Sequence, residues 1–319
     1  MGDISFIFPG QGSQGIGMGK ALYNAYGEAR AVFAEASDAV GFDLAKLCFE
    51  GPEEELNRTE NTQPAILTAS LAVNAVLGTM HIKPGTVAGH SLGELTAVAA
   101  AGGLTVGQAA ALAKKRGRLM QDAVPQGRGL MAAVLGLEPE KVREACAQAS
   151  SVGVVAPANY NSPGQVVIAG EKAAVEKAAE VCTAMGAKKV IPLAVSVPSH
   201  CPLMAPAAEG LKEALDAVSL KDLEVPLACN AEGRFVNRAQ DVKEALIKQL
   251  TSPLLWEDCV KAMVAEGARV VVEVGPGKVL SGLVKRITKE VEIRSVEDET
   301  SLNTTLDYLA TGCKFSPKK

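Results

Sequence analysis

The stretch with the clearest chemical meaning is a Gly-x-Ser-x-Gly pattern that runs from Gly89 to Gly93, with Ser91 at its centre. An apolar segment ends at Ala88, and an alanine-rich segment typical of a helix runs from Leu95 to Ala101. A strand, a sharp turn and a helix are the context in which this pattern marks a nucleophilic serine, whereas the plainer interpretation is a turn of small residues. Glycines suit a turn in which two chain segments approach too closely for a side chain. The serine is then expected at a helix N-terminus, where free N–H groups favour negative charge.

A serine hydroxyl needs a base that takes its proton, and histidine is the usual one. The sequence has three histidines, His81, His90 and His200. His81 ends a predicted helix and is interpreted as structural. His90 adjoins the serine, and because neighbours on a strand point to opposite faces, it is expected to line the site rather than to act as the base. His200 lies in a loop bounded by prolines, and rigid support of this kind suits a catalytic base.

The third member of a triad is less clear from the sequence. Hydrolases with this pattern carry an Asp or Glu between the serine and the histidine. The only aspartate in that interval is Asp122, which ends a basic helical segment and has no evident reason to reach His200. A backbone carbonyl is the alternative partner for the imidazole. For the two backbone donors of an oxyanion hole, we expect Leu92 and the glycine-rich loop from Gly10 to Gly12.

Strand-like and helical segments alternate along most of the chain, beginning with a buried strand at Ile4–Phe8. Residues 125–195 instead follow the order β-α-β-β-α-β, which is the ferredoxin-like unit. The sequence therefore predicts an α/β fold: a parallel-sheet, hydrolase-like core from residues 1–124 and 196–319, with an inserted small ferredoxin-like α+β subdomain at 125–195. Ser91 is expected at the carboxyl end of a strand, where open α/β sheets bind ligands.

Some element boundaries are predicted from local signals. One helix is expected from about Gly19 to Val40, another from Pro64 to His81, and a third from Thr105 to Ala123 with Thr105 as its N-cap. A lysine, Lys278, follows a Gly-Pro-Gly turn, but the glycine spacing does not match a phosphate-binding loop. The last residues, Cys313 to Lys319, are expected to form a frayed basic tail.

Composition limits the class of protein. The chain has 319 residues, 48% of them hydrophobic, which is ample for a packed core. It has no apolar run of about 18 residues, and no signal-peptide pattern follows Met1, so we expect a cytoplasmic protein that does not enter a membrane. Seven scattered cysteines without a C-x-x-C pair argue against disulfides and structural zinc. A net charge of −4 gives no support to nucleic-acid binding.

Taken together, these stretches resemble the malonyl-CoA:acyl carrier protein transacylases of bacterial-type fatty acid synthesis, and the resemblance runs almost end to end. The stretches that carry it are Phe8–Gln14, Asn61–Ala65, Gly89–Glu94, Arg116–Gly117, Asn159–Gln165, Val197–His200 and Glu273–Gly277.

The resemblance implies a role for particular positions. Ser91 matches the serine that becomes malonylated, and His200 matches its base. Gln249 matches the residue whose backbone carbonyl holds that histidine, which removes the need for an acid. The other implied residues are the oxyanion-hole donors Gln11 and Leu92, the carboxylate-binding Arg116, and the substrate-binding His90 and Asn159.

The resemblance also implies a ping-pong transfer from malonyl-CoA to the phosphopantetheine thiol of an acyl carrier protein, with no metal or bound cofactor. Carrier proteins of this kind are acidic, so a net acidic enzyme needs a local basic patch for docking. Candidate residues for that patch are Lys188, Lys189, Lys285 and Arg286. Nothing in the sequence favours a dimer, and a monomer is expected.

Three alternatives stay open at this level. A serine esterase or thioesterase would need an acid between Ser91 and His200 and would use water as the acceptor. A non-catalytic interaction module would keep the fold without the chemistry. A discrete acyltransferase of polyketide synthesis would share nearly every motif.

Overall fold

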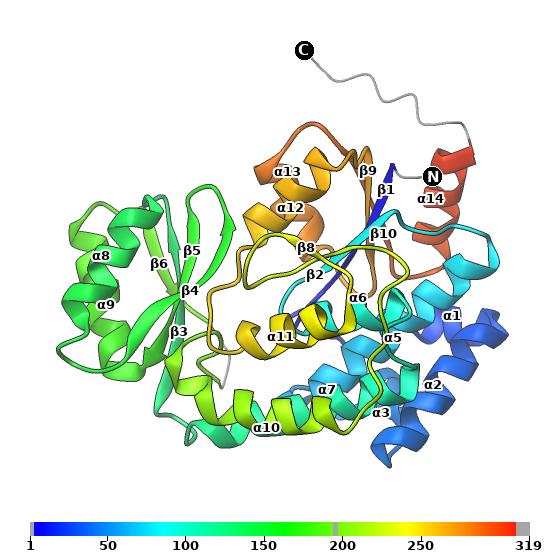
Figure 1. Cartoon of the computed structure of the whole chain (residues 1–319), viewed down its shortest axis with the longest axis horizontal. Coiled ribbons are helices and arrows are strands. Elements are labelled where there is room, and N and C mark those ends of the chain that lie inside the picture. Colours follow the sequence, from blue (N-terminus) through cyan, green and yellow to red (C-terminus); the bar gives the residue numbers. More distant parts are fainter. Residues whose placement is uncertain (1–2, 194–196, 311–319) are drawn as a thin grey trace.

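The computed structural model describes residues 3–193 and 197–310, which contain one large and mostly parallel sheet and one small antiparallel sheet (Figure 1). The predicted junction at residues 195 and 196 and the predicted tail from Cys313 to Lys319 lie outside the described residues. Within the described part, no helix is long and apolar enough to cross a membrane.

The large sheet has six strands in the order β10-β9-β1-β2-β7-β8. Neighbouring strands are parallel except for β7 and β8, which form an antiparallel pair at one edge. In the pairing of β1 with β2, Phe8 lies beside Gly89, so the loops that leave these two strands emerge side by side. The strands are β1 (Ile4–Phe8), β2 (Thr86–Gly89), β7 (Leu227–Ala228), β8 (Phe235–Val236), β9 (Val270–Val274) and β10 (Glu292–Val296).

Helices cover both faces of this sheet, because its strands are apolar on both sides. In β1, Phe6 and Phe8 enter the larger core, whereas Ile7 points to the opposite face and enters a second core. The second core is covered by α12 (Trp256–Ala265) and α13 (Val279–Ile287). Helices that contribute to the larger core are α1 (Lys20–Ala25), α2 (Gly27–Val40), α3 (Leu44–Glu50), α4 (Glu53–Leu56), α5 (Thr59–Thr79), α6 (Leu92–Ala100), α7 (Val106–Ala123), α10 (Ala205–Asp216), α11 (Ala239–Gln249) and α14 (Glu299–Ala310).

The small sheet has the order β4-β5-β3-β6, with every neighbouring pair antiparallel. Its two helices pack on one face and lie on the side away from the large sheet in Figure 1. The opposite face carries Met131, Ala133 and Val167, which point toward the larger part of the molecule. The predicted ferredoxin-like arrangement is therefore confirmed. Its elements are β3 (Gly129–Leu135), α8 (Pro139–Ala149), β4 (Val155–Ser162), β5 (Gln165–Glu171), α9 (Lys172–Ala184) and β6 (Lys189–Pro192).

Several predicted boundaries were wrong. The helix expected from Gly19 to Val40 is divided at Tyr26, whose extended backbone (φ −120°, ψ 131°) ends α1 and begins α2. The helix expected to start at Pro64 begins at Thr59 and contains the proline, although proline favours the first turn of a helix. It ends at Thr79, two residues before His81. The expected cap of α7 is present, because Thr105 and Gln108 form a capping box.

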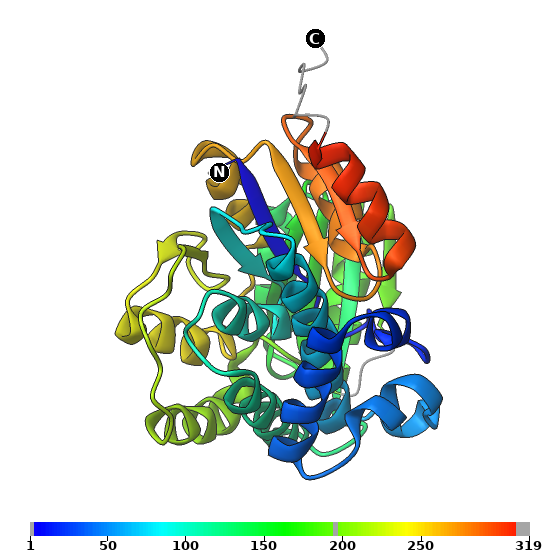
Figure 2. The same ribbon diagram turned by 90° about the vertical axis from the view of Figure 1, so that its right-hand side faces the viewer.

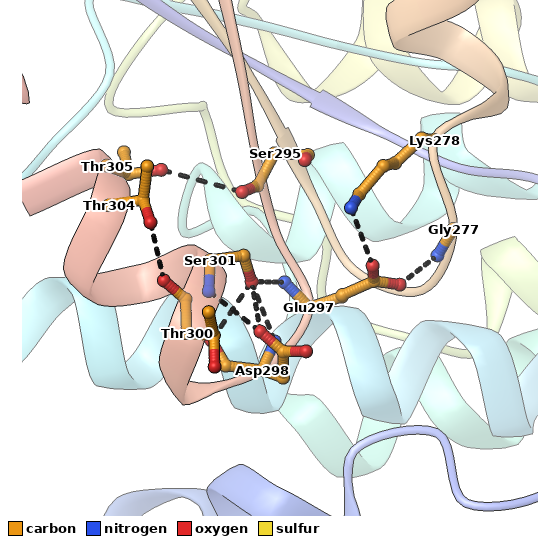
Figure 3. A network of polar contacts seen from close by, with 9 residues as sticks. All are labelled: Gly277, Lys278, Ser295, Glu297, Asp298, Thr300, Ser301, Thr304 and Thr305. Carbon is orange, nitrogen blue, oxygen red and sulfur yellow. Dashed lines mark hydrogen bonds and ion pairs between the residues drawn. The ribbon is translucent and has the colours of Figure 1, made fainter.

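The C-terminal strand and helix, β10 and α14, were not predicted; they lie side by side at the edge of the large sheet (Figure 2). The start of α14 is held by a polar network in which the N–H of Ser301 donates to Asp298 Oδ1 at 2.8 Å (Figure 3). In the same network the ammonium of Lys278 pairs with Glu297 at 3.3 Å. This lysine therefore has a structural partner next to its Gly-Pro-Gly turn.

Candidate active site

The turn between β2 and α6 places Ser91 at the carboxyl edge of the large sheet. Ser91 is the N-cap of α6 and has φ 55° and ψ −107°, a backbone conformation that residues other than glycine rarely adopt. The turn is possible because a Cβ on Gly89 would lie 1.8 Å from the carbonyl oxygen of Gly93, and one on Gly93 would lie 2.0 Å from that of Phe8. The predicted strand, sharp turn and helix are confirmed, together with the close approach that requires glycine.

The predicted base lies next to the serine. His200 Nε2 is 2.8 Å from Ser91 Oγ, and His200 Nδ1 is 2.8 Å from the backbone oxygen of Gln249. A carbonyl oxygen can only accept, so Nδ1 carries the proton and Nε2 is left as the acceptor for the serine hydroxyl. The hydrogen bonds that link the Ser91 hydroxyl, the His200 imidazole and the Gln249 backbone carbonyl are therefore those expected for proton abstraction from the serine.

Burial keeps the imidazole neutral. His200 is 2% exposed, and its pKa is lowered to about 3, chiefly by burial and secondarily by the positive charge of Arg116. A neutral imidazole is the form that accepts a proton. The base is therefore available throughout the neutral pH range.

The acid required by a hydrolase triad does not reach this histidine. The side chain of Asp122 is 67% exposed and lies 3.7 Å from Arg118 Nε, one helical turn earlier on α7. The Nδ1 proton of His200 is already donated to the Gln249 carbonyl. The geometry thus disfavours the esterase hypothesis in its triad form.

Arg116 extends from α7 into the site and is 3% exposed. Its Nη2 donates to Gln249 Oε1 at 2.8 Å and to Ser91 Oγ at 3.2 Å, and its Nη1 donates to Gln63 Oε1 at 2.8 Å. These partners are neutral, and no acidic side chain of residues 3–193 and 197–310 forms an ion pair with this guanidinium within 4.0 Å. Burial lowers the pKa of Arg116 to about 10, so it remains a cation at neutral pH. A buried guanidinium that lacks a direct ion pair is able to bind a carboxylate.

These groups open into a cavity of about 270 Å³ between the large sheet's carboxyl edge and the small sheet. Met131, Ala133 and Val167 of the small sheet form its apolar wall. The cavity is also lined by the predicted site residues Gln11, His90, Ser91, Leu92, Arg116, Asn159 and His200.

His90 and Asn159 form the polar side of this cavity. His90 Nε2 is 2.9 Å from Asn161 Oδ1 and 3.4 Å from Asn159 Nδ2, and its ring lies against Trp256 with a centroid separation of 5.6 Å. Burial lowers the pKa of His90 as well, so this imidazole is also held neutral. His90 therefore lines the cavity, as expected, and its partners are asparagines of β4.

The two expected oxyanion donors lie at the start of α6 and in the loop after β1. Leu92 is the first residue of α6, so its N–H has no helical carbonyl one turn before it. The loop after β1 approaches the serine turn so closely that a Cβ on Gly10 would lie 2.4 Å from the His90 oxygen. Gln11 follows directly, and its side chain donates to Thr59 Oγ1 at 3.3 Å.

Two residues that contact the site were not singled out from the sequence. Gln63 binds Arg116 and was visible only as part of the Asn61–Ala65 stretch. Asn230 is fully buried; its Oδ1 accepts from the N–H of Ser91 at 3.0 Å, and its Nδ2 donates to the Gly89 oxygen at 2.8 Å. Its one sequence signal is its place just after β7, at the same carboxyl edge as the serine.

The fold and the site together define a class: an α/β protein in which a serine at a strand-to-helix turn is hydrogen-bonded to a buried histidine. The chain belongs to the acyl transferase domain family, whose model matches residues 5–305.

Relatives agree with this assignment. The malonyl CoA-acyl carrier protein transacylase of Haemophilus influenzae is 46% identical over 97% of this chain and 100% of its own length. The crystal structure of an acyl carrier protein S-malonyltransferase from Vibrio cholerae has a TM-score of 0.93 and 47% identity, covering 95% of this chain and 99% of that chain. A malonyl-transacylase in complex with a type II polyketide synthase acyl carrier protein has a TM-score of 0.93 and 45% identity, covering 96% and 99%.

Proposed function

We propose that this chain transfers the malonyl group from malonyl-CoA to the phosphopantetheine thiol of an acyl carrier protein, through a malonyl ester on Ser91. The observation that carries the proposal is Arg116, a buried cation whose Nη2 lies 3.2 Å from Ser91 Oγ and which forms no direct ion pair within residues 3–193 and 197–310. Malonyl differs from acetyl by a free carboxylate, and a guanidinium binds a carboxylate through two parallel hydrogen bonds. Acyl transfer and malonyl selectivity then follow from one pair of neighbouring side chains.

In the first half-reaction, Ser91 Oγ attacks the thioester carbonyl while its proton moves to His200 Nε2. The oxyanion that forms is expected to accept from the N–H groups of Leu92 and Gln11. When the carbon–sulfur bond breaks, the imidazolium returns the proton to the sulfur of CoA. The malonyl ester remains on the serine, with its carboxylate on Arg116.

The second half-reaction runs the same steps with another thiol. His200 takes the proton of the phosphopantetheine thiol, and the thiolate attacks the ester carbonyl. The carbon–oxygen bond to Ser91 then breaks, and the serine oxygen recovers the proton from the imidazolium. The carboxylate on Arg116 holds the acyl group in place between the two steps, which supports transfer over hydrolysis.

The acceptor follows from the named relatives. The Haemophilus influenzae relative is named for transfer to acyl carrier protein, which supports a role in fatty acid biosynthesis. The polyketide complex is equally similar in fold, so a polyketide carrier protein is the alternative acceptor. Comparing the two carrier proteins as acceptors of the preloaded enzyme distinguishes these roles.

Further parts of the proposal concern the whole molecule. We place the catalytic part in residues 1–124 and 196–319, and the second wall of the site in residues 125–195. A cytoplasmic, monomeric enzyme is expected, and light scattering coupled to size-exclusion chromatography tests the monomer.

Intact-protein mass spectrometry after a brief incubation with malonyl-CoA tests the function. We expect a malonyl adduct that forms on the wild-type protein, disappears when carrier protein is added, and is absent from Ser91→Ala. Acetyl-CoA should give much less adduct. Steady release of CoA without an adduct would instead indicate a hydrolase, and neither adduct nor CoA release would indicate a non-catalytic protein.

A further inference from the structure

A second buried charge lies beneath the site, on the helix that begins after the nucleophile. Glu94 of α6 is fully buried. Its Oε1 accepts from the backbone N–H of Asn230 at 3.0 Å, and its Oε2 accepts from Nε2 of Gln249. Burial raises the pKa of Glu94 to about 7, while these two donors and the charge of Arg116 act in the opposite direction. Nothing in the mechanism above uses this carboxylate.

Gln249 connects Glu94 to the reacting groups. Its backbone oxygen accepts from His200 Nδ1 at 2.8 Å, and its side-chain Oε1 accepts from Arg116 Nη2 at 2.8 Å. Its Nε2 donates to the Ser91 backbone oxygen at 2.9 Å and to the Glu94 carboxylate. One glutamine thus contacts the predicted base, the predicted carboxylate-binding arginine and the serine turn. Glu94 supplies the one charged acceptor of its NH₂ group, which also donates to Asn230 Oδ1 at 3.3 Å.

We propose that Glu94 is a positioning residue, which holds the Gln249 amide in the one orientation that presents Oε1 to Arg116 and so aims the guanidinium at the malonyl carboxylate. The proposal rests on the malonyl transfer proposed above. Glu94 acts through Gln249 and Arg116 and does not itself line the cavity.

The chemistry explains why a carboxylate occupies this position. Both oxygens of Glu94 face donors, a backbone N–H and an amide N–H, and this geometry fits the ionised carboxylate, which is acceptor-only. An amide in its place offers one oxygen and one NH₂, so one of the two donors faces another donor. If Gln249 rotates to relieve this contact, its NH₂ turns toward Arg116, which is also donor-only. A change from carboxylate to amide at residue 94 is therefore transmitted to the arginine.

The separation of the two charges has a further consequence. Glu94 and Arg116 are bridged by the Gln249 amide instead of forming a direct ion pair. The negative charge compensates the buried guanidinium at a distance. A direct carboxylate partner would occupy the guanidinium N–H groups, whereas in this arrangement Arg116 lines the cavity and donates to the neutral oxygens of Gln63, Gln249 and Ser91.

The test compares Glu94→Gln with a matched control, Glu273→Gln. Glu273 is equally buried and also accepts two N–H groups, those of Leu280 at 3.1 Å and Ser281 at 2.7 Å at the start of α13. It contacts neither Gln249 nor Arg116 among the hydrogen bonds of the described residues. Each variant is loaded separately with malonyl-CoA and with acetyl-CoA, and the initial rate of Ser91 acylation is measured by quenched-flow mass spectrometry.

Glu94→Gln should lower the malonylation rate by about 10- to 100-fold, which corresponds to one lost charge-assisted hydrogen bond. The acetylation rate should fall much less, because acetyl has no carboxylate for Arg116, so the malonyl-to-acetyl ratio falls about tenfold or more. Glu273→Gln should lower the stability of the fold and leave that ratio within about twofold of wild type. Glu94→Asp, which keeps two acceptor oxygens, should recover part of the ratio.

An unchanged ratio in Glu94→Gln would overturn the proposal, as would an equal fall in Glu273→Gln. If Glu94→Gln does not fold, Glu94→Asp decides: its shorter carboxylate should slow malonylation more than acetylation, and an equal slowing of both overturns the positioning role. A wild-type protein that forms no malonyl adduct would instead refute the proposed function. The two failures are therefore distinguishable in one experiment.

Discussion

At the scale of single residues, the proposed malonyl selectivity depends on a buried positive charge that forms no direct ion pair among the described residues. Arg116 donates to Gln63, Gln249 and Ser91, all of them neutral. A solvated arginine would gain little from a carboxylate, because exposed ion pairs contribute only about 0–1 kcal/mol. Burial at 3% exposure makes the same pairing much stronger, since the cation has already lost its water.

Replacing Arg116 by alanine should therefore remove malonyl selectivity. We expect the malonylation rate of Arg116→Ala to fall by about 30- to 5,000-fold, which corresponds to the about 2–5 kcal/mol lost when one partner of a buried charge pair is truncated. Acetyl transfer should fall less. Arg118→Ala on the same helix is the matched control, because that side chain is 70% exposed. Equal losses for both acyl groups would mean that Arg116 has a structural role.

The buried base predicts a pH dependence of stability. The pKa of folded His200 is lowered to about 3 from the ordinary 6.5, so below pH 6.5 the unfolded chain binds a proton that the folded protein does not. The folded state is then progressively destabilised as the pH falls from about 6.5 toward 3, and the effect is absent at higher pH. The free energy of unfolding of wild type minus that of His200→Gln should decrease on acidification, with a slope approaching about 1.4 kcal/mol per pH unit.

Urea denaturation of both proteins at pH 7.5 and at about pH 5 measures this difference. Using the difference cancels the other titrating groups that the two proteins share. A difference in unfolding free energy that is the same at both pH values would show that the folded protein accommodates a protonated His200.

The residues of the site differ in how far sequence can locate them. Ser91 and His200 are identifiable because nucleophile and base are restricted to few residue types, and the chain has three histidines. The partner of His200 has no such signal, since any residue can supply a backbone carbonyl. Asn230 has only its position just after β7 as a signal. Its contact with Ser91 spans 139 positions of sequence, and no local pattern predicts a contact of that kind.

At the scale of elements, the serine turn is the most constrained part of the chain. A Cβ on Gly89 would lie 1.8 Å from the oxygen and 1.9 Å from the carbon of the Gly93 carbonyl, and backbone atoms cannot move aside as a flexible side chain can. Gly89→Ala should therefore destabilise the protein by more than about 3 kcal/mol, beyond the usual effect of overpacking. A glycine-to-alanine change in open space provides the comparison.

That comparison is Gly282→Ala, in the interior of α13, where nothing lies within 4 Å of the added Cβ. It should stabilise the protein by about 0.5–1 kcal/mol, since alanine favours a helix over glycine. The midpoints of urea denaturation give both values. A loss under about 1 kcal/mol for Gly89→Ala would show that β2 and α6 can separate without cost.

Elements with strong periodicity or clear caps were predictable, and those without were not. The capping box at Thr105 and the β-α-β-β-α-β order are local signals, so both appear in the structure. The strand β10 has five residues, only two of them apolar, and the alternation of polar and apolar residues breaks at Ser295, so its sequence does not distinguish it from a loop. The division at Tyr26 depends on a backbone conformation that no residue pattern requires.

At the scale of the whole molecule, the site is built between two sheets that different parts of the chain supply. The backbone of Leu254 joins them: its N–H donates to the Ala158 oxygen and its oxygen accepts from the Tyr160 N–H, each at 2.8 Å. This pairing places Asn159 beside His90. A second link lies beside the cavity, where Arg286 Nη1 on α13 donates at 2.6 Å to Oε1 of Gln165, a residue of the cavity lining.

The position of Arg286 predicts that its substitution slows transfer to the carrier protein, the second half-reaction. Arg286 is exposed, lies in the last turn of α13 beside Lys285, and contacts a residue that lines the cavity. An acidic carrier protein that docks beside the cavity on this side meets a positive charge despite the net charge of −4. Arg286→Glu should slow transfer to carrier protein by about tenfold and increase its KM, and the effect should weaken with added salt.

The measurement starts from enzyme already loaded with malonyl, so that binding of CoA does not enter the rate. Lys141→Glu on α8 is the matched control, because it makes the same charge change at an exposed position on the outer side of the small sheet (Figure 1). Since charge reversal at both positions changes the net charge equally, only a local effect separates the variants. Equal slowing in both variants would mean that the overall charge of the protein, and not the local charge at Arg286, governs docking.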